Sequence, residues 1–367
     1  MKIAFDGKRF FQNKSGLGNY SRDLVRILAT GFPENDYLIF NKTETSNGAA
    51  ILQLPNVNFV PTTKGYLTRQ LKMGIDAQNA GAEIFHGLSG ELPLKWNSKP
   101  IKKIVTIHDL IFLRYPKYYP FIERKIHLWK FRKAARQADL IIAISEQTKR
   151  DIVEFLHVPE DKIQVVYQGC HQAFKENQGE QVLNSVKAKY GLPDRFILNV
   201  GTIEERKNLL NIVKAVNGTE IPLVVIGRKT KYFNKIRKFL KKNKLENQVH
   251  FLENVSMDEL AAIYKLADIF VYPSLFEGFG IPVIEALFSG TPVITSNVSC
   301  LPEAGGENSV FIDPNNFKDI SAKINFLLNN RSERDRRAEK GLQFVQKFSD
   351  DTISKQLMSL YKGVLQS

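Results

Sequence analysis

Two glutamates in a glycine-containing segment are the first candidates for chemistry in this sequence. The stretch SLFEGFGIPVIEALFSGTPVITS runs from Ser274 to Ser296 and places Glu277 and Glu285 eight positions apart. Glutamates near the start of a helix can simply be favourable surface partners of the helix dipole. A carboxylate also presents only hydrogen-bond acceptors, which suits paired sugar hydroxyls. The elements around the two side chains decide between a surface role and a binding role.

A strand-to-helix connection is predicted around the two glutamates. The apolar runs DIFVYPS and TPVITS on either side predict strands. Between them, Gly278 and Gly280 predict a loop, Pro282 a first helical turn and Gly290 a helix stop. Ligands of open α/β sheets bind at the edge where such connections lie. The placement therefore favours a binding role.

Paired cations occupy a second predicted strand-to-helix connection. In NVGTIEERKNLL, a strand ends at Gly201 and Thr202, and Arg206 and Lys207 directly precede the predicted helix NLLNIVKAV. The helix dipole attracts anions at this position, so two adjacent cations need an anion beside them. A diphosphate would satisfy the cations and the helix together. A solvated face without a ligand is the alternative.

The N-terminal half contains weaker candidates. Gly16 and Gly18 open a helix in KSGLGNYSRDLVRIL, but Ser21 replaces the third glycine of a dinucleotide fingerprint, so a dehydrogenase is not predicted. Backbone N–H groups at such a turn can bind phosphate, and a plain flexible turn is an equal alternative. His108 and Asp109 follow a strand in a ligand-facing position, although a single His is more often a structural residue.

Alternating strands and helices along the whole chain predict an α/β fold with two doubly wound parallel sheets. Five apolar runs come first and five more follow: KIAFDG, DYLIFNK, EIFHG, KKIVTIHDL, ADLIIAIS, RFILNVGT, IPLVVIGR, QVHFLEN, ADIFVYPS and TPVITS. Helices are predicted between them, including residues 20–28 and 121–137, and Ser256 to Glu259 form a capping box.

The predicted domains are residues 1–172 and 173–347, with a hinge at 169–174. The charged stretch 175–181 is the linker candidate, and a loop of the second domain is the alternative. A chain of 367 residues is long enough for two domains that each bury a core.

Cysteine content and apolar runs indicate the compartment. Cys170 and Cys300 are too few for a disulfide framework and form no metal-type pair. Charged residues interrupt the apolar run at the N-terminus, so no signal peptide is predicted, and no apolar run approaches membrane-spanning length. We therefore expect a cytoplasmic protein.

The chain is basic, with a net charge of +14 and a pI near 9.5, and this charge attracts anionic partners. Residues 1–170 carry 25 Lys and Arg against 16 Asp and Glu, so the first half is the more basic one. No helix-turn-helix, zinc or ribonucleoprotein pattern is present, and nucleic acid is not a predicted partner. No Asp-x-Asp metal motif is apparent, so no metal cofactor is expected.

A basic aromatic segment runs from Arg114 to Gln137. It carries eight basic residues and one acidic residue, interleaved with aromatic side chains. This composition predicts contact with an anionic membrane surface, where a lipid-linked acceptor would be presented. The alternative is that Phe121, Ile126, Trp129 and Ala134 face the core of the first domain.

Taken in order, these motifs resemble the retaining, nucleotide-sugar-dependent glycosyltransferases of family four. The motifs are Gly16-Leu-Gly18, His108-Asp109, GTIEERKN, VIGR and EGFGIPVIE, and they span nearly the whole chain. The Glu-x7-Glu run and the Arg206-Lys207 pair are the specific part. The resemblance implies the GT-B fold, in which two Rossmann-like domains face each other across a cleft. It also implies that residues 348–367 form a helix crossing back to the first domain.

The resemblance assigns roles to these residues. Arg206 and Lys207 would clamp the donor diphosphate, Glu285 would hold the ribose diol and Glu277 the hexose hydroxyls. Residues expected to act in catalysis are His108, Arg206, Lys207 and Glu277. Residues expected to bind the donor are Gly16, Gly18, Arg206, Lys207, Gly227, Glu277, Phe279, Gly280 and Glu285. Many relatives carry Arg where this chain has Thr202, which makes Arg206 the substitute cation.

The implied function is transfer of a hexose from a nucleotide-diphosphate sugar to a glycan or lipid-linked acceptor. Similarity to bacterial mannosyltransferases of surface polysaccharide, including lipopolysaccharide, favours GDP-mannose. The enzyme would be peripheral on the inner face of the membrane if the basic segment binds lipid. A nucleotide-sugar epimerase of the same fold and a catalytically silent sugar-nucleotide-binding subunit are the alternatives, and acceptor-dependent release of nucleotide separates them.

Overall fold

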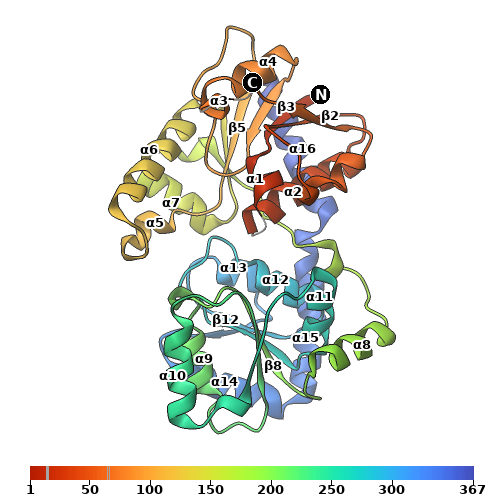
Figure 1. Cartoon of the computed structure of the whole chain (residues 1–367), viewed down its shortest axis with the longest axis vertical. Coiled ribbons are helices and arrows are strands. Elements are labelled where there is room, and N and C mark those ends of the chain that lie inside the picture. Colours follow the sequence, from red (N-terminus) through yellow and green to blue (C-terminus); the bar gives the residue numbers. More distant parts are fainter. Residues whose placement is uncertain (14–15, 64, 66) are drawn as a thin grey trace. The chain divides into compact units, whose positions relative to one another are not determined.

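The computed structural model describes residues 1–13, 16–63, 65 and 67–367. The chain divides into two compact α/β units (Figure 1). Unit 1 comprises Met1–Gly169 and Phe348–Ser367, and unit 2 comprises Cys170–Lys347. The first segment of unit 1 therefore ends at Gly169, three residues before the expected domain boundary at 172. The linker candidate 175–181 lies inside unit 2, where residues 175–179 form a loop and residues 180–181 begin helix α8 (Glu180–Tyr190).

Unit 1 is built on a seven-stranded parallel sheet with the order β3-β2-β1-β4-β5-β6-β7. The strands are β1 Lys2–Asp6, β2 Asp36–Asn41, β3 Val57–Pro61, β4 Ile84–Gly87, β5 Lys102–Ile107, β6 Leu140–Ala143 and β7 Ile163–Val165. The two edge strands, β3 and β7, are not predicted from the sequence. An edge strand is paired on one side only, so it needs a weaker apolar pattern than a central one.

Helices cover both faces of this sheet (Figure 1). They are α1 Lys8–Gln12, α2 Gly16–Gly31, α3 Thr68–Leu71, α4 Met73–Asn79, α5 Ile111–Arg114, α6 Phe121–Gln137, α7 Glu146–Leu156 and α16 Asp350–Gln366. The C-terminal helix α16 packs against α2, where Arg26 pairs with Asp350 at 2.8 Å. Tyr361 of α16 also bonds His86 of β4 at 2.7 Å inside the core. These contacts attach the end of the chain to unit 1.

Unit 2 contains a six-stranded parallel sheet with the order β10-β9-β8-β11-β12-β13. The strands are β8 Ile197–Val200, β9 Leu223–Ile226, β10 Val249–Leu252, β11 Ile269–Tyr272, β12 Val293–Ser296 and β13 Val310–Ile312. The strand order reverses between β8 and β11. In a doubly wound sheet, loops that leave the carboxyl ends of these two strands form the ligand-binding crevice. The edge strand β13 is not predicted from the sequence.

The helices of unit 2 are α8, α9 Leu209–Ala215, α10 Phe233–Asn243, α11 Met257–Leu266, α12 Ile281–Phe288, α13 Leu301–Gly305, α14 Phe317–Asn329 and α15 Arg331–Val345. The predicted capping box is confirmed at the start of α11, where Ser256 and Glu259 bond reciprocally. The predicted helix at 121–137 is confirmed as α6. Among the described residues, no helix combines the length and apolarity needed to cross a bilayer.

Candidate active site

Two loops of unit 2 meet at the point where the strand order reverses. One follows β8 and carries Arg206 and Lys207, and the other follows β11 and leads to Glu277. A backbone hydrogen bond joins the loops, because the Leu275 N–H donates to the Arg206 carbonyl at 2.9 Å. Asn208 adds a second attachment, since its side-chain amide donates to the Pro273 carbonyl at 3.0 Å. The two loops therefore hold their side chains as one structure.

Glu277 is the centre of a compact charged cluster. Its Oε2 pairs with Nη1 of Arg206 at 2.8 Å, and its Oε1 pairs with Nζ of Lys207 at 2.6 Å. Oε1 also accepts hydrogen bonds from the Tyr272 hydroxyl at 3.0 Å and the Ser274 hydroxyl at 2.5 Å. Oε1 thus has three described donors and Oε2 has one cation.

The cluster fixes the charge of Glu277. Burial alone would raise the pKa of Glu277, but Lys207 and Arg206 outweigh burial and lower this pKa to about 2. Burial lowers the pKa of Lys207 against the attraction of Glu277. The sequence predicts a diphosphate as the anion beside the two cations. In this structure the Glu277 carboxylate lies beside both cations, and Glu204 pairs with Arg206 as well at 2.7 Å. Two carboxylates therefore accompany the two cations.

The backbone around Glu277 is held by the loop after β12. The Ser299 hydroxyl accepts a hydrogen bond from the Glu277 N–H at 3.2 Å. Ser299 itself has a left-handed backbone, with φ of +53°. The Cys300 thiol donates to the Phe279 carbonyl at 2.8 Å. Gly280 has φ of +123°, and a Cβ there would lie 3.1 Å from Leu301. Gly280 is therefore required by its conformation, and it begins the turn into α12.

Glu285 lies in α12, only 9% exposed, and its environment differs from that of Glu277. The Tyr264 hydroxyl donates to Oε2 of Glu285 at 3.1 Å. Within the described residues, this is the only hydrogen bond of the Glu285 carboxylate, which has no ion pair. Burial raises the pKa of Glu285 to about 7, against the smaller effect of Tyr264. Its second oxygen is consequently available to a ligand.

Close packing requires a glycine at position 227, and this requirement is not evident from the sequence. A Cβ at Gly227 would lie 1.9 Å from the Gly201 carbonyl oxygen. The loops after β8 and β9 therefore approach each other closely, which only glycine permits. This packing accounts for the glycine without a ligand.

The expected site residues of unit 1 gather near the start of α2. Gly16 and Gly18 lie in the first turn of this helix, and a Cβ at Gly18 would lie 1.9 Å from the Asn13 carbonyl oxygen. Tyr20 packs edge-on against His108, with ring centroids 4.5 Å apart.

His108 itself is neutral near physiological pH. Its Nε2 lies 2.8 Å from the Leu88 carbonyl oxygen. Because a carbonyl can only accept, Nε2 carries the proton. Burial lowers the pKa of His108 to about 4, although the bond to Leu88 opposes this shift. The side chain can therefore act as a hydrogen-bonding group without adding charge.

The chain matches two known protein families. The family described as Glycosyltransferase Family 4 matches residues 25–173, and Glycosyl transferases group 1 matches residues 184–344. Together these matches span most of both units. The chain belongs to the family-four glycosyltransferases.

This glycosyltransferase is similar over its whole length to several known proteins. O-antigen chain mannosyltransferase B of Escherichia coli is 28% identical over 396 aligned residues, which cover 99% of this chain and 100% of that protein. A glycosyltransferase from Rickettsia africae has a TM-score of 0.79 at 18% identity, covering 100% and 99% of the two chains. Anabaena HepE, solved with UDP and glucose, has a TM-score of 0.76 at 15% identity, covering 98% and 99%. The predicted GT-B fold of two Rossmann-like units is confirmed.

Several residues of the glycosyltransferase's charged cluster were not predicted. Tyr272 and Ser274 bond Glu277 from the end of β11, and Ser299 and Tyr264 hold the two glutamates from other elements. Tyr272 and Ser274 are two positions apart, so an alternation argument along DIFVYPS could have placed them on one face. The contacts of Ser299 and Tyr264 depend on tertiary packing and have no sequence signal.

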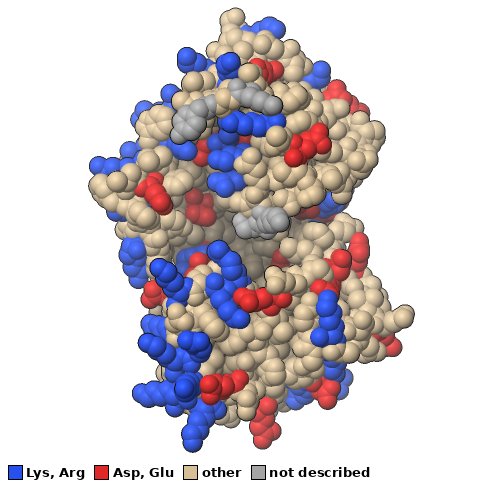
Figure 2. Space-filling model, viewed as in Figure 1, with Lys and Arg blue, Asp and Glu red and all other residues tan. Residues whose placement is uncertain are grey.

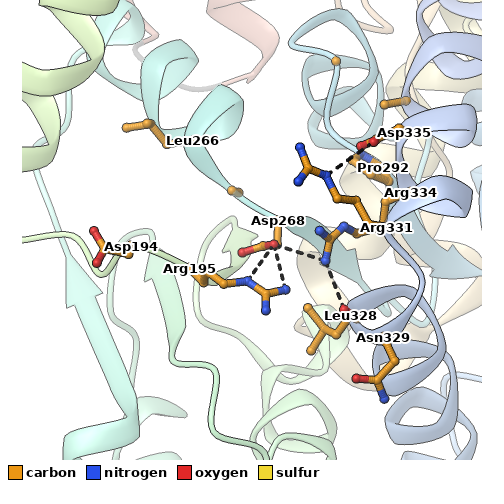
Figure 3. A pocket seen from close by; sticks show the side chains of 13 residues that line it. Asp194, Arg195, Leu266, Asp268, Pro292, Leu328, Asn329, Arg331, Arg334 and Asp335 are labelled. Carbon is orange, nitrogen blue, oxygen red and sulfur yellow. Dashed lines mark hydrogen bonds and ion pairs between the residues drawn. The ribbon is translucent and has the colours of Figure 1, made fainter.

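A hollow of about 600 Å³ lies at the amino ends of the strands of the unit 2 sheet, opposite the charged cluster (Figure 3). Its lining includes residues just before β8, β11 and β12, whereas the charged cluster follows these strands. Arg195 and Arg334 both bond Asp268 there, at 3.1 Å and 3.2 Å. Arg195 and Arg334 therefore already have an acidic partner, and neither is left for an anionic ligand. The hollow is separate from the charged cluster around Glu277. Among the described residues, no three His, Cys, Asp or Glu side chains gather as metal ligands.

Proposed function

We propose that this glycosyltransferase moves a hexose from a nucleotide-diphosphate sugar to a glycan or lipid-linked acceptor in bacterial surface polysaccharide synthesis. The observation that carries the proposal is the cluster of Arg206, Lys207 and Glu277 at the ligand-binding edge of unit 2. Enzymes that cleave a sugar-phosphate bond must stabilise the charge that develops on the leaving diphosphate. Fixed cations at this edge serve that purpose.

The two cations have capacity left for a diphosphate. An ammonium group has three N–H donors, and Lys207 uses two of them on Tyr272 and Glu277. The side chains of Arg206 and Lys207 are both 16% exposed, so they reach solvent. We assign the leaving-group charge to these cations and require no metal ion for it. Because Glu277 already holds both side chains in place, they need little reorganisation when charge develops.

The two glutamates would hold different parts of the donor. We assign Glu285 to the ribose diol, because its Oε1 has no hydrogen-bond partner among the described residues. We assign Glu277 to the hexose hydroxyls through Oε2, whose single described partner is Arg206. Gly280 and Phe279 would present backbone to the same sugar. From unit 1, the resemblance assigns His108 to the donor sugar and Gly16 and Gly18 to the diphosphate.

The proposed reaction retains the configuration of the sugar. The bond between the anomeric carbon and the diphosphate oxygen breaks, and the acceptor hydroxyl oxygen bonds to that carbon on the same face. The hydroxyl proton passes to the departing phosphate oxygen. The ring becomes flatter and more positive as the bond breaks, and the Glu277 carboxylate stabilises it.

GDP-mannose is the proposed donor. The support is the similarity to O-antigen chain mannosyltransferase B across both chains. HepE, whose structure holds UDP and glucose, is similar at 15% identity, a level that carries the fold and not the choice of sugar.

A donor screen followed by a transfer assay tests the proposal. GDP-mannose should raise the melting temperature of the purified protein more than UDP-glucose, UDP-galactose or GDP alone. GDP release should then depend on a mannose-terminated acceptor, with an α-linked product by NMR and no loss of rate in EDTA. Release of an epimerised nucleotide sugar without acceptor would contradict transfer. Stabilisation by a different nucleotide sugar would contradict the donor assignment alone.

A further inference from the structure

Helix α6 presents large apolar side chains to solvent. Phe121 is 59% exposed, Ile122 71%, Ile126 49% and Trp129 54%. The expected alternative, in which Phe121, Ile126 and Trp129 face the core, is therefore wrong, and of that set only Ala134 is buried. Residues spaced by three and four positions share one side of a helix. The exposed apolar side chains thus form a continuous face.

Cations share this face of α6 with the apolar side chains. Lys125 and Lys133 lie on the same side of the helix by spacing. Nζ of Lys125 lies 4.6 Å from the Phe121 ring centroid, and Nζ of Lys133 lies 5.7 Å from that of Trp129. Neither lysine has an ion pair with a described residue. The face is therefore both apolar and positively charged.

A basic hollow of about 400 Å³ lies at the C-terminal end of α6. It is lined by Arg132, Ala135, Arg136, Leu156, His157, Val158, Pro159 and Lys162. No acidic residue is among these described lining residues. Lys162 donates to the Arg136 carbonyl at 3.4 Å, and Arg132 donates to the Phe155 carbonyl at 3.3 Å. Because carbonyls are their hydrogen-bond partners, the cations of the hollow keep their charge for an external anion.

Helix α10 of unit 2 shows what an ordinary basic helix looks like in this protein. It carries five Lys and Arg between Phe233 and Asn243, and basic side chains gather over it in Figure 2. Its apolar residues Ile236 and Leu240 are buried, and it has no large apolar side chain among the exposed ones. A solvated amphipathic helix has this arrangement. The exposed face of α6 departs from it because apolar side chains lie among its cations.

We propose that unit 1 binds the surface of an anionic lipid bilayer through the exposed face of α6 and the adjoining basic hollow. Aromatic and aliphatic side chains would enter the headgroup boundary, while Lys125 and Lys133 would meet lipid phosphates. The hollow would take one anionic headgroup. This binding is independent of the donor and of the reaction, and it would bring the enzyme to an acceptor carried on lipid.

Vesicle sedimentation of the full-length protein tests the proposal, without donor present. The protein should sediment with vesicles of phosphatidylcholine and phosphatidylglycerol, bind pure phosphatidylcholine vesicles at least about tenfold more weakly, and dissociate as salt is raised. The double variant Ile122→Ser/Trp129→Ser should lose about tenfold or more in vesicle affinity. Its control, Phe326→Ser/Leu342→Ser, changes two exposed apolar residues of unit 2 and should bind like the wild type.

A charge-reversal pair separates α6 from general electrostatic attraction. Lys125→Glu/Lys133→Glu should lose about tenfold or more in affinity for the anionic vesicles. Lys238→Glu/Lys241→Glu makes the same change of net charge on α10 and should lose at most about twofold. Equal losses in the two variants would overturn the proposal, as would absence from both kinds of vesicle or displacement of bound protein from anionic vesicles by duplex DNA.

Fluorescence provides a readout at the proposed contact. The chain has two tryptophans, Trp96 and Trp129. Anionic vesicles should shift the emission of the wild type to shorter wavelength. Trp129→Phe should keep vesicle binding and lose this shift, whereas a persistent shift would place the contact elsewhere and contradict the proposal. All variants should retain transfer to a water-soluble acceptor, so failed membrane binding is distinguishable from failed catalysis.

Discussion

The two glutamates of the EGFGIPVIE segment share one loop and helix but have opposite environments. Glu277 is paired with two cations, and its pKa is lowered to about 2. Glu285 is buried beside a single tyrosine hydroxyl, and its pKa is raised to about 7. Both are about nine-tenths buried, so burial alone does not separate them. The neighbours supplied by other elements do.

Because their environments differ, the two carboxylates are suited to different tasks. Glu277 is an anion at neutral pH, because its pKa is lowered to about 2, and it holds cations where diphosphate charge would develop. Glu285 is an uncompensated carboxyl group whose charge depends on pH and on what binds it. We expect Glu277 to act in the transition state and Glu285 in donor binding, and the following experiments are ordered by the size of the expected effect.

Loss of a cation at Glu277 should have the largest effect. Lys207→Ala should cost about 2 to 4 kcal/mol of transition-state stabilisation, because a preorganised charge donor is removed. Steady-state kinetics should show this as a fall in kcat/KM of roughly 30- to 1000-fold. Lys214→Ala, seven residues further along at the last turn of α9, is the matched control and should be within about twofold of wild type. Wild-type turnover and donor affinity in Lys207→Ala would remove the clamp from the mechanism.

Glu277→Gln should lower kcat by about 100-fold with a smaller change in KM. The amide keeps the shape of the side chain but removes the charge that would stabilise the positive sugar ring and that orients both cations. Glu204→Gln, which removes the other carboxylate paired with Arg206, is the control and should change kcat little. An unchanged kcat with weakened binding would reverse the roles assigned to the two glutamates.

The two glutamates should affect stability in opposite directions with pH. The folded pKa of Glu285, about 7, exceeds the ordinary value of 4.5, so its contribution to stability is largest below 4.5 and is lost as pH rises through 7. Glu285→Gln should therefore stabilise the fold at pH 8 by up to about 3 kcal/mol and change little at pH 4.

The folded pKa of Glu277, about 2, is below 4.5, so its contribution is present above 4.5 and is lost as pH falls towards 2. Glu277→Gln should destabilise the fold at pH 7 by about 3 kcal/mol, and the difference should shrink in acid. Urea unfolding at several pH values measures both variants. Parallel pH dependences in the two variants would show that their environments do not differ in this way.

The smallest expected effect is on donor binding. Glu285→Gln should raise the donor KM about tenfold with little change in kcat, because the ribose is bound equally in the ground and transition states. Calorimetry should give a matching loss of donor affinity. This second measurement is needed because KM equals the donor dissociation constant only when chemistry is slow. Wild-type donor affinity should also rise as pH passes 7 and Glu285 ionises. If neither the donor KM nor the calorimetric affinity changes, Glu285 does not bind the donor and its role is structural.

Local patterns in the sequence are sufficient to predict the architecture and the family of this protein. Apolar runs such as IPLVVIGR and ADIFVYPS predict central strands correctly, because a parallel strand buried on both faces must be apolar throughout. The capping box at Ser256 and the helix stop at Gly290 are equally local signals. The Glu-x7-Glu run and the Arg206-Lys207 pair were sufficient to recognise a family-four glycosyltransferase.

Which side chains come into contact depends on the packing of elements that are distant in the sequence. Lys207 and Glu277 are 70 residues apart in sequence and come into contact because β8 and β11 are neighbours at the point where the strand order reverses. The exposed face of α6 depends likewise on which side of the helix the sheet covers. Burial and pairing are properties of neighbours from distant elements, so two glutamates with the same local sequence signal can have pKa values on opposite sides of the ordinary one.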